Sequence, residues 1–319
     1  GNPAAQAHSF TPEEAQSVSA ASSTDCFRKG VSPATPRAKE GVSPTTLYPV
    51  LALVPVSVPV APANPLAPTQ EEARAEAGRC IQCECLECVK RCVYLAHYKG
   101  YPKRYAREIY NNLAVVHGQR RANTQINSCA ECGLCAEICP FDADMGAFCA
   151  AARNDMVATN RMPPRPHEFA LQDMEFSNAP DVAFFRHQPG LEKSRWAFFP
   201  GCQLPASMPA QAEAVYDHLK DHLDGGVGLF FSCCGAPARW TGRPRLTGSA
   251  AEALRAVWEQ AGKPELILAC ASCVEFFTYE LPDLPVKTLW DVLASLPLPE
   301  GPAVFPATLA MHAPCVTRH

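Results

Sequence analysis

The pattern of hydrophobic and polar positions differs between the two halves of this chain. From residue 195 onward, short apolar runs alternate with amphipathic stretches whose apolar positions recur at helical spacing. The apolar runs are WAFF (196–199), VGLFF (227–231) and ELILA (265–269), and the amphipathic stretches cover residues 209–223 and 248–262. This alternation predicts β-α-β units that build a parallel sheet.

Residues 69–159 show short helical patterns instead, without an alternating strand signal. The sequence TQEEARAEAGRC predicts a helix capped by Thr69, because a threonine side chain and acidic residues in the first turn both stabilise a helix N-terminus. Residues 160–194 carry several prolines and little periodicity, so we expect a connecting segment that lies across a surface. The predicted fold class is α+β multidomain, with a mostly helical domain (69–159) followed by an α/β parallel-sheet domain (195–305).

The first 68 residues are rich in alanine, serine, proline and threonine, and we expect them to be disordered or extended. The longest apolar stretch, residues 47–65, contains five prolines. Prolines at this spacing would break a spanning helix every few residues, so the sequence predicts no transmembrane segment.

The amino-acid composition limits which partners and which bound groups are expected. The chain has 28 basic and 32 acidic residues and a formal charge of -4, which favours neither nucleic acid nor an anionic membrane as a partner. It has 17 cysteines among 319 residues, and its start does not resemble a signal peptide. We therefore expect a cytoplasmic protein, and in a reducing compartment clustered cysteines are more often metal ligands than disulfides.

The densest cysteine pattern is SCAECGLCAEICP, whose spacing C-x2-C-x2-C-x3-C-P is that of a [4Fe-4S] site. In two-cluster proteins the fourth cysteine of such a run binds the other cluster, so a second array is expected. The segment RCIQCECLECVKRC supplies it with the spacing C-x2-C-x4-C-x3-C. The predicted cluster-binding residues are Cys80, Cys83, Cys88, Cys92, Cys129, Cys132, Cys135 and Cys139.

The crossing rule assigns these thiolates to two clusters, one held by Cys80, Cys83, Cys88 and Cys139 and the other by Cys92, Cys129, Cys132 and Cys135. The earlier array resembles the N-terminal iron-sulfur segment of the glutamate synthase small subunit family, although Val93 stands where that family usually has proline. Cys85 remains an alternative to Cys83. The competing interpretation is a pair of structural zinc sites, but zinc sites usually split into two distant Cys pairs. Cys149 is interpreted as a small buried hydrophobic residue.

The remaining cysteines of interest directly follow the predicted strands. Because the carboxyl ends of parallel strands share one edge of a sheet, we expect five thiols from three loops to converge on one metal-sulfur site. Glycines beside them would let the backbone approach a bulky group, and the last pair would begin a helix that favours negative charge. The alternatives are ordinary core cysteines and zinc, although five thiolates exceed the four that structural zinc takes. The five are Cys202, Cys233, Cys234, Cys270 and Cys273.

These spacings resemble the CCG domain family, which occurs in the catalytic subunit of heterodisulfide reductase and in iron-sulfur subunits of glycolate, lactate and glycerol-3-phosphate oxidation systems. Its pattern is a single Cys, a Cys-Cys-Gly and a Cys-x2-Cys, and here 30 residues separate Cys202 from Cys233 and 34 separate Gly235 from Cys270. The resemblance implies that the five cysteines hold a further [4Fe-4S] cluster of noncubane type and are the catalytic residues. Residues 306–319 resemble the start of a second such domain, which would then be truncated.

The resemblance as a whole implies an iron-sulfur oxidoreductase of heterodisulfide reductase type, as a subunit or a fragment. Electrons would pass through two [4Fe-4S] cubanes to the CCG-bound cluster, where a disulfide-type substrate is reduced. The alternative is a non-catalytic electron-transfer subunit that feeds or drains a flavoprotein. The expected partner is a flavin-containing, hydrogenase-type or quinol-linked redox subunit, and analogy of fold does not choose between the two functions.

Overall fold

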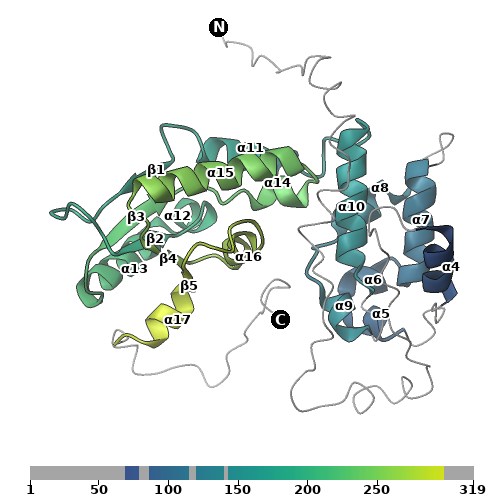
Figure 1. Cartoon of the computed structure of the whole chain (residues 1–319), viewed down its shortest axis with the longest axis horizontal. Coiled ribbons are helices and arrows are strands. Elements are labelled where there is room, and N and C mark those ends of the chain that lie inside the picture. Colours follow the sequence, from purple (N-terminus) through teal and green to yellow (C-terminus); the bar gives the residue numbers. More distant parts are fainter. Residues whose placement is uncertain (1–68, 79–85, 115–119, 140–142, 298–319) are drawn as a thin grey trace, which may run out of the picture.

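The structure is a computed structural model that describes residues 69–78, 86–114, 120–139 and 143–297 (Figure 1). The N-terminal leader and the segment resembling a second CCG domain lie outside the described residues. So do three cysteines of the earlier array, Cys80, Cys83 and Cys85. The described residues form a helical domain and an α/β domain that lie next to each other (Figure 1).

The helical domain confirms the sequence-based expectation of a region without strands among its described residues. Its helix α4 begins after Thr69, whose hydroxyl accepts a hydrogen bond from the backbone N–H of Glu72 at 3.2 Å. The Glu72 carboxylate in turn accepts from the backbone N–H of Thr69 at 2.7 Å, which completes a capping box. The helices are α4 (Gln70–Gly78), α5 (Glu87–Arg91), α6 (Val93–His97), α7 (Pro102–Ala114), α8 (Ala122–Ser128), α9 (Leu134–Ile138) and α10 (Met145–Ala158).

One apolar core holds the helices from α5 to α10 together. Leu95 and Ile126 are fully buried in it, and helix α10 packs against both α7 and α8. The short helices α5 and α9, which carry cysteines of the two arrays, also contact each other. Helix α10 is therefore the central helix of this core, and the cysteine-bearing segments lie along one part of its length (Figure 1).

The α/β domain contains one five-stranded sheet within the described residues, in the order β1-β3-β2-β4-β5. The four strands from β2 to β5 are parallel, as the sequence predicts, whereas the edge strand β1 runs antiparallel to β3. The strands are β1 (Phe184–Arg186), β2 (Trp196–Phe199), β3 (Val227–Phe231), β4 (Glu265–Leu268) and β5 (Val286–Thr288). The helices are α11 (Glu168–Ser177), α12 (Gln203–Ser207), α13 (Pro209–His222), α14 (Ala236–Trp240), α15 (Pro244–Gln260), α16 (Ala271–Glu280) and α17 (Leu289–Ala294).

Helices cover both faces of the sheet, which explains why its central strands are continuously apolar. Phe199 belongs to the core under α15 and α16, whereas the preceding Phe198 belongs to the core under α13 and α17. Both side chains are fully buried, because successive residues of a strand point to opposite faces. The domain is thus a three-layer sandwich with all its parallel strand ends at one edge.

The connecting segment 160–194 contains two regular elements that its sequence pattern did not predict, α11 and β1. Helix α11 packs on α14, and its Met174 lies in a buried cluster with Cys233. Strand β1 has three residues and pairs with one neighbour, so its sequence carries too little alternation to predict a strand. Helix α11 was not predicted because prolines at positions 163, 164 and 166 directly precede it and indicate a loop.

Candidate metal centres

The structure places the five cysteines of the α/β domain at the carboxyl edge of the sheet. Cys202 follows β2 and precedes α12, and Cys233 and Cys234 lie between β3 and α14. Cys270 and Cys273 lie at the start of α16, after β4. Because β2 lies between β3 and β4, the three loops are neighbours in space although 30 or more residues separate them in sequence.

The five thiols form a continuous chain of sulfur contacts. Cys202 is within hydrogen-bond distance of Cys233, which also contacts Cys234. Cys234 contacts Cys273, and Cys273 contacts Cys270. The three central members, Cys233, Cys234 and Cys273, are buried, whereas the two ends of the chain are partly exposed. The arrangement therefore brings together every residue of the predicted third site.

Two glycines permit this convergence, as the sequence predicts. Gly201 has a φ of 76°, and a Cβ atom built on it would lie 3.2 Å from the Cys273 sulfur. Gly235 has a φ of 98°, and its Cβ would lie 2.7 Å from the Cβ of Ala250. Positive φ values of this size favour glycine, so both positions combine a conformational and a steric requirement.

The electrostatic environment favours thiolates at two of these positions. Hydrogen bonds from Cys233 and Cys273 lower the pKa of Cys234 to about 5. A hydrogen bond from Cys273, aided by the backbone N–H groups of Ser272 and Cys273, lowers the pKa of Cys270 to about 6. These N–H groups belong to the first turn of α16, where unpaired donors and the helix dipole stabilise negative charge. The site can thus present anionic sulfur, which is the form that binds iron.

In the helical domain the described cysteines gather around α5 and α9. Cys88 lies within α5 and Cys92 directly follows it, while Cys135 lies within α9 and Cys139 directly follows it. Cys88 and Cys135 are buried in one core, and Cys92 and Cys129 pack against that core. The two arrays are therefore adjacent, as a pair of clusters that exchange ligands requires. The places of Cys80 and Cys83 in this arrangement lie outside the described residues.

Backbone amides point at two of these sulfur atoms. The N–H of Met145 donates to the Cys135 sulfur at 3.2 Å, and the N–H of Glu131 donates to the Cys129 sulfur at 3.4 Å. Hydrogen bonds of this kind to cluster sulfur ligands are one of the factors that set reduction potentials. They also fix the direction in which each cysteine side chain points.

Cys149, interpreted from sequence as a buried hydrophobic residue, is fully buried but has polar contacts as well. Its thiol is within hydrogen-bond distance of Cys129 and lies 3.6 Å from the Tyr94 hydroxyl. The Cys129 contact is the main cause of a lowered pKa at Cys149 and of a raised pKa at Cys129. No pattern in the sequence indicates this contact, because 19 residues and a loop separate the two cysteines.

The α/β domain offers five thiols in one row, which is one more ligand than a structural zinc ion takes. Tetrahedral zinc needs four such ligands around one point. An extended row of thiols fits a cluster instead, in which different thiolates bind different iron atoms.

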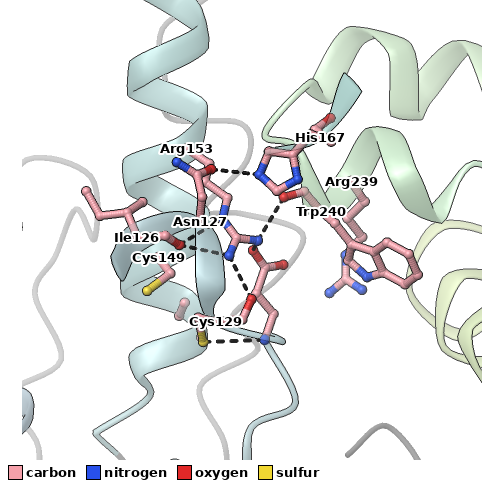
Figure 2. A network of polar contacts seen from close by, with 12 residues as sticks. Ile126, Asn127, Cys129, Cys149, Arg153, His167, Arg239 and Trp240 are labelled. Atoms are coloured by element: carbon pink, nitrogen blue, oxygen red, sulfur yellow. Dashed lines mark hydrogen bonds and ion pairs between the residues drawn. The ribbon is translucent and has the colours of Figure 1, made fainter. Parts of the chain in front are cut away.

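A buried arginine, Arg153, joins the helical domain to the α/β domain, and sequence analysis did not single it out (Figure 2). The Arg153 guanidinium on α10 lies 2.5 Å from the Glu131 carboxylate, and both side chains are over 90% buried. Arg153 also donates to three backbone carbonyl oxygens, those of Ile126 at 2.8 Å, Cys129 at 2.7 Å and Trp240 at 2.8 Å. The Trp240 contact crosses to the α/β domain, so this arginine ties a cysteine-bearing loop to the neighbouring domain.

Further contacts surround this junction. Burial raises the pKa of Glu131 to about 7, against the opposing effects of Arg153 and Arg239. Arg239 itself forms an ion pair with Glu275, two residues past Cys273, at 3.2 Å. The junction thus extends electrostatically from the loop of Cys129 toward the helix that begins at the third site.

A cavity of about 910 Å³ opens beside the third site. Its walls come from α11, the turn into β1, residues 232–233 after β3, and α15. Most of the lining is apolar, and Cys233 forms part of the wall. The volume lies within the range of about 300–1,000 Å³ that small-molecule sites occupy in proteins.

Two stretches of the sequence match known families. Residues 79–144 match the family described as a 4Fe-4S dicluster domain, and residues 196–278 match the family described as a cysteine-rich domain, CCG. Together with the thiol geometry, these matches define an iron-sulfur electron-transfer protein in which a dicluster domain precedes a CCG domain. They support [4Fe-4S] clusters in both parts, including one in the CCG domain.

Two known proteins are similar to this chain in sequence. An uncharacterized iron-sulfur protein of Methanococcus maripaludis is 22% identical, over 74% of this chain and 51% of the relative. One of the subunits of the fumarate reductase (CoM/CoB) of Methanothermobacter marburgensis is 24% identical, over 60% of this chain and 41% of the relative. The chain thus spans about half, or less, of the length of these relatives. No solved structure shows significant similarity to it. None of the helices in the described residues combines the length and apolar character needed to cross a bilayer.

Proposed function

We propose that this protein reduces a disulfide at the CCG site with electrons that reach it from the dicluster domain. The observation that carries the proposal is the unbroken row of five thiols at the carboxyl edge of the sheet, with a cavity against one of its members. When bound by these thiolates, an iron-sulfur cluster supplies one-electron steps close to a substrate sulfur. In the overall reaction a disulfide takes up two electrons and two protons and becomes two thiols.

The residues divide into three proposed roles. Cys80, Cys83, Cys88, Cys92, Cys129, Cys132, Cys135 and Cys139 would hold the two clusters of the helical domain. Cys202, Cys233, Cys234, Cys270 and Cys273 would hold the third cluster, and the low pKa values of Cys234 and Cys270 favour that role. The Arg153 junction would keep the two domains at a fixed separation, which electron transfer between them requires.

A second candidate is an electron-transfer subunit whose partner carries out the chemistry. It is favoured by the name of one relative, which is a subunit of a reductase, and by the partial coverage of both relatives. The partner would be a flavin-containing, hydrogenase-type or quinol-linked redox protein. In this case the third site would hand electrons on and no disulfide would react there.

An assay with protein that was purified without oxygen, and with reduced methyl viologen as the electron donor, distinguishes these two proposed functions. Under the first proposal, adding a disulfide reoxidises the viologen catalytically, and the isolated chain contains about twelve iron and twelve sulfide atoms. Cys273→Ala is the informative variant, because it removes a thiol from the CCG site only. It should lose the turnover and about four iron atoms while viologen still reduces the other two clusters. Turnover that appears only after a flavoprotein is added supports the second candidate, and an iron-free chain refutes both.

A further inference from the structure

The side chain of Asn178 contacts the loop that carries Cys233, which lies 55 positions later in the sequence. Asn178 directly follows helix α11, and its backbone N–H donates to carbonyl oxygens of that helix. Its side-chain amide oxygen accepts two hydrogen bonds from outside the helix, one from the Ser232 hydroxyl at 2.7 Å and one from the backbone N–H of Cys233 at 2.9 Å. A single oxygen atom therefore holds two consecutive residues at the carboxyl end of β3.

The backbone N–H of Cys233 needs this acceptor. In the described residues, the pairing of β3 with its neighbours ends at Phe231, so the N–H of Cys233 lies beyond the hydrogen bonds of the sheet. Cys233 is buried, and a buried N–H without an acceptor destabilises the folded state. Asn178 thus supplies from α11 the acceptor that strand pairing does not supply.

Helix α11 is held at both ends, which gives Asn178 a defined place. Near the carboxyl end of the helix, Met174 lies in a buried cluster with Cys233, and the helix packs on α14. At the amino end, the His167 imidazole lies 2.7 Å from the side-chain oxygen of Asn127 in the helical domain (Figure 2). The helix that positions Asn178 therefore contacts both cysteine-rich domains.

Cys233 links two parts of the thiol row. Its sulfur is within hydrogen-bond distance of Cys202 on one side and of Cys234 on the other, so it joins the loop after β2 to the remaining thiols. The amide nitrogen that donates to Asn178 is one covalent bond from the Cα atom that carries this thiol. Hydrogen bonds just outside the ligands of a metal site commonly orient those ligands. Loss of the Asn178 oxygen would therefore let the Cys233 sulfur leave the row.

From these contacts we infer that Asn178 is a positioning residue of the CCG site, which holds the Cys233 sulfur in line with the other four thiols. The inference rests on the proposed role of Cys233 as a cluster ligand, and it holds whether or not a disulfide reacts at the cluster. Asn178 and Ser232 line the cavity together with Cys233, so these contacts also form part of the cavity wall.

Variants of Asn178 in the full chain, purified without oxygen, test this role. Asn178→Leu keeps the size of the side chain and removes the acceptor. We expect a chelator to remove about four iron atoms from it about tenfold faster or more, with an altered EPR spectrum for that cluster alone. Asn178→Asp keeps an oxygen that accepts the same two bonds, so it should lose iron at the rate of the unmodified protein. Its negative charge should lower the midpoint potential of that cluster in an EPR-monitored titration, because reduction adds further negative charge.

Two reference variants make the result specific. Gln188→Leu is the matched control, because the Gln188 amide oxygen accepts from the backbone N–H of Val227 at 2.8 Å, at the opposite end of β3. This variant should leave the rate of iron loss and all cluster spectra unchanged. Cys233→Ala should contain about four iron atoms fewer, and the spectrum that it lacks identifies the third cluster.

The inference is overturned if Asn178→Leu retains its iron and its spectra as Gln188→Leu does, since Asn178 would then contribute to stability alone. If Asn178→Leu does not fold, Asn178→Asp decides, and an unchanged midpoint potential in that variant overturns the inference. Full iron content in Cys233→Ala would refute the proposed ligand role itself. Loss of iron in Cys233→Ala, without an effect of either Asn178 variant, would refute the positioning role only.

Discussion

Arg153 offers the sharpest test of how the two domains are joined. Replacing it with methionine keeps a long side chain but leaves the Glu131 carboxylate buried without its cation. Three carbonyl oxygens, at Ile126, Cys129 and Trp240, lose their donor at the same time. Removing one member of a buried ion pair typically costs about 3–5 kcal/mol, because the partner must either keep its charge in a medium that solvates it poorly or take up a proton, and the pKa of Glu131 is already raised to about 7 by burial. This is a large fraction of the stability of an ordinary domain, about 5–15 kcal/mol.

Native-state hydrogen exchange measures this cost locally, which suits a chain of several domains with bound clusters. Amides of α10 should exchange about a hundredfold faster or more in Arg153→Met, since about 1.4 kcal/mol corresponds to a factor of ten. Arg104→Met is the matched control, because Arg104 forms a 2.8 Å ion pair with Glu108 on an exposed helix face. Exposed pairs at this spacing contribute only about 0.3–0.5 kcal/mol.

The double variant Arg153→Met/Glu131→Met completes a thermodynamic cycle. It should regain part of the lost protection, because no unpaired charge stays buried, although the three carbonyl oxygens still lack a donor. Arg153→Met exchanging as slowly as Arg104→Met would refute the reasoning. So would a double variant whose loss equals the sum of the two single losses, since the two side chains would then be energetically independent.

Three further predictions test other parts of the structure. Gly242 has a φ of 72°, and a Cβ built on it would lie 2.5 Å from the backbone of α10, so Gly242→Ala should lower the thermal midpoint. Gly248→Ala in α15 should raise it, because that position is helical and open; equal effects of the two would contradict this account. The Cys149→Ala variant should contain as much iron as the unmodified protein, whereas the Cys129→Ala variant should contain about four iron atoms fewer. A loss of iron in both variants would show that Cys149 is a cluster ligand. Burial lowers the pKa of His167 from 6.5 to about 4 in the folded protein. Between these two pH values the unfolded state binds more protons than the folded state. The free energy of unfolding therefore decreases as the pH falls through this window. His167→Gln should flatten that part of the stability curve in denaturant titrations, and an unchanged slope would exclude His167 as its source.

Much of the architecture follows from local sequence. Buried parallel strands such as Trp196–Phe199 need uninterrupted apolar residues, and the helices between them need an apolar stripe, so both patterns are visible in a single chain. The adjacency of Cys202, Cys234 and Cys270 was also predictable, because parallel strands deliver the residues that follow them to the same edge. The same reasoning could not find β1, whose three residues owe their conformation to pairing with β3.

The tertiary structure alone decided how these parts meet. Arg153 and Trp240 are 87 residues apart, and nothing near either of them indicates that the guanidinium of one binds the carbonyl of the other. The contacts between Cys129 and Cys149 and between Asn178 and Cys233 are of the same kind. The hydrophobic periodicity of a helix or strand indicates which of its faces is buried. A specific polar contact depends instead on which other element packs against that face. That is fixed only when the whole chain has folded.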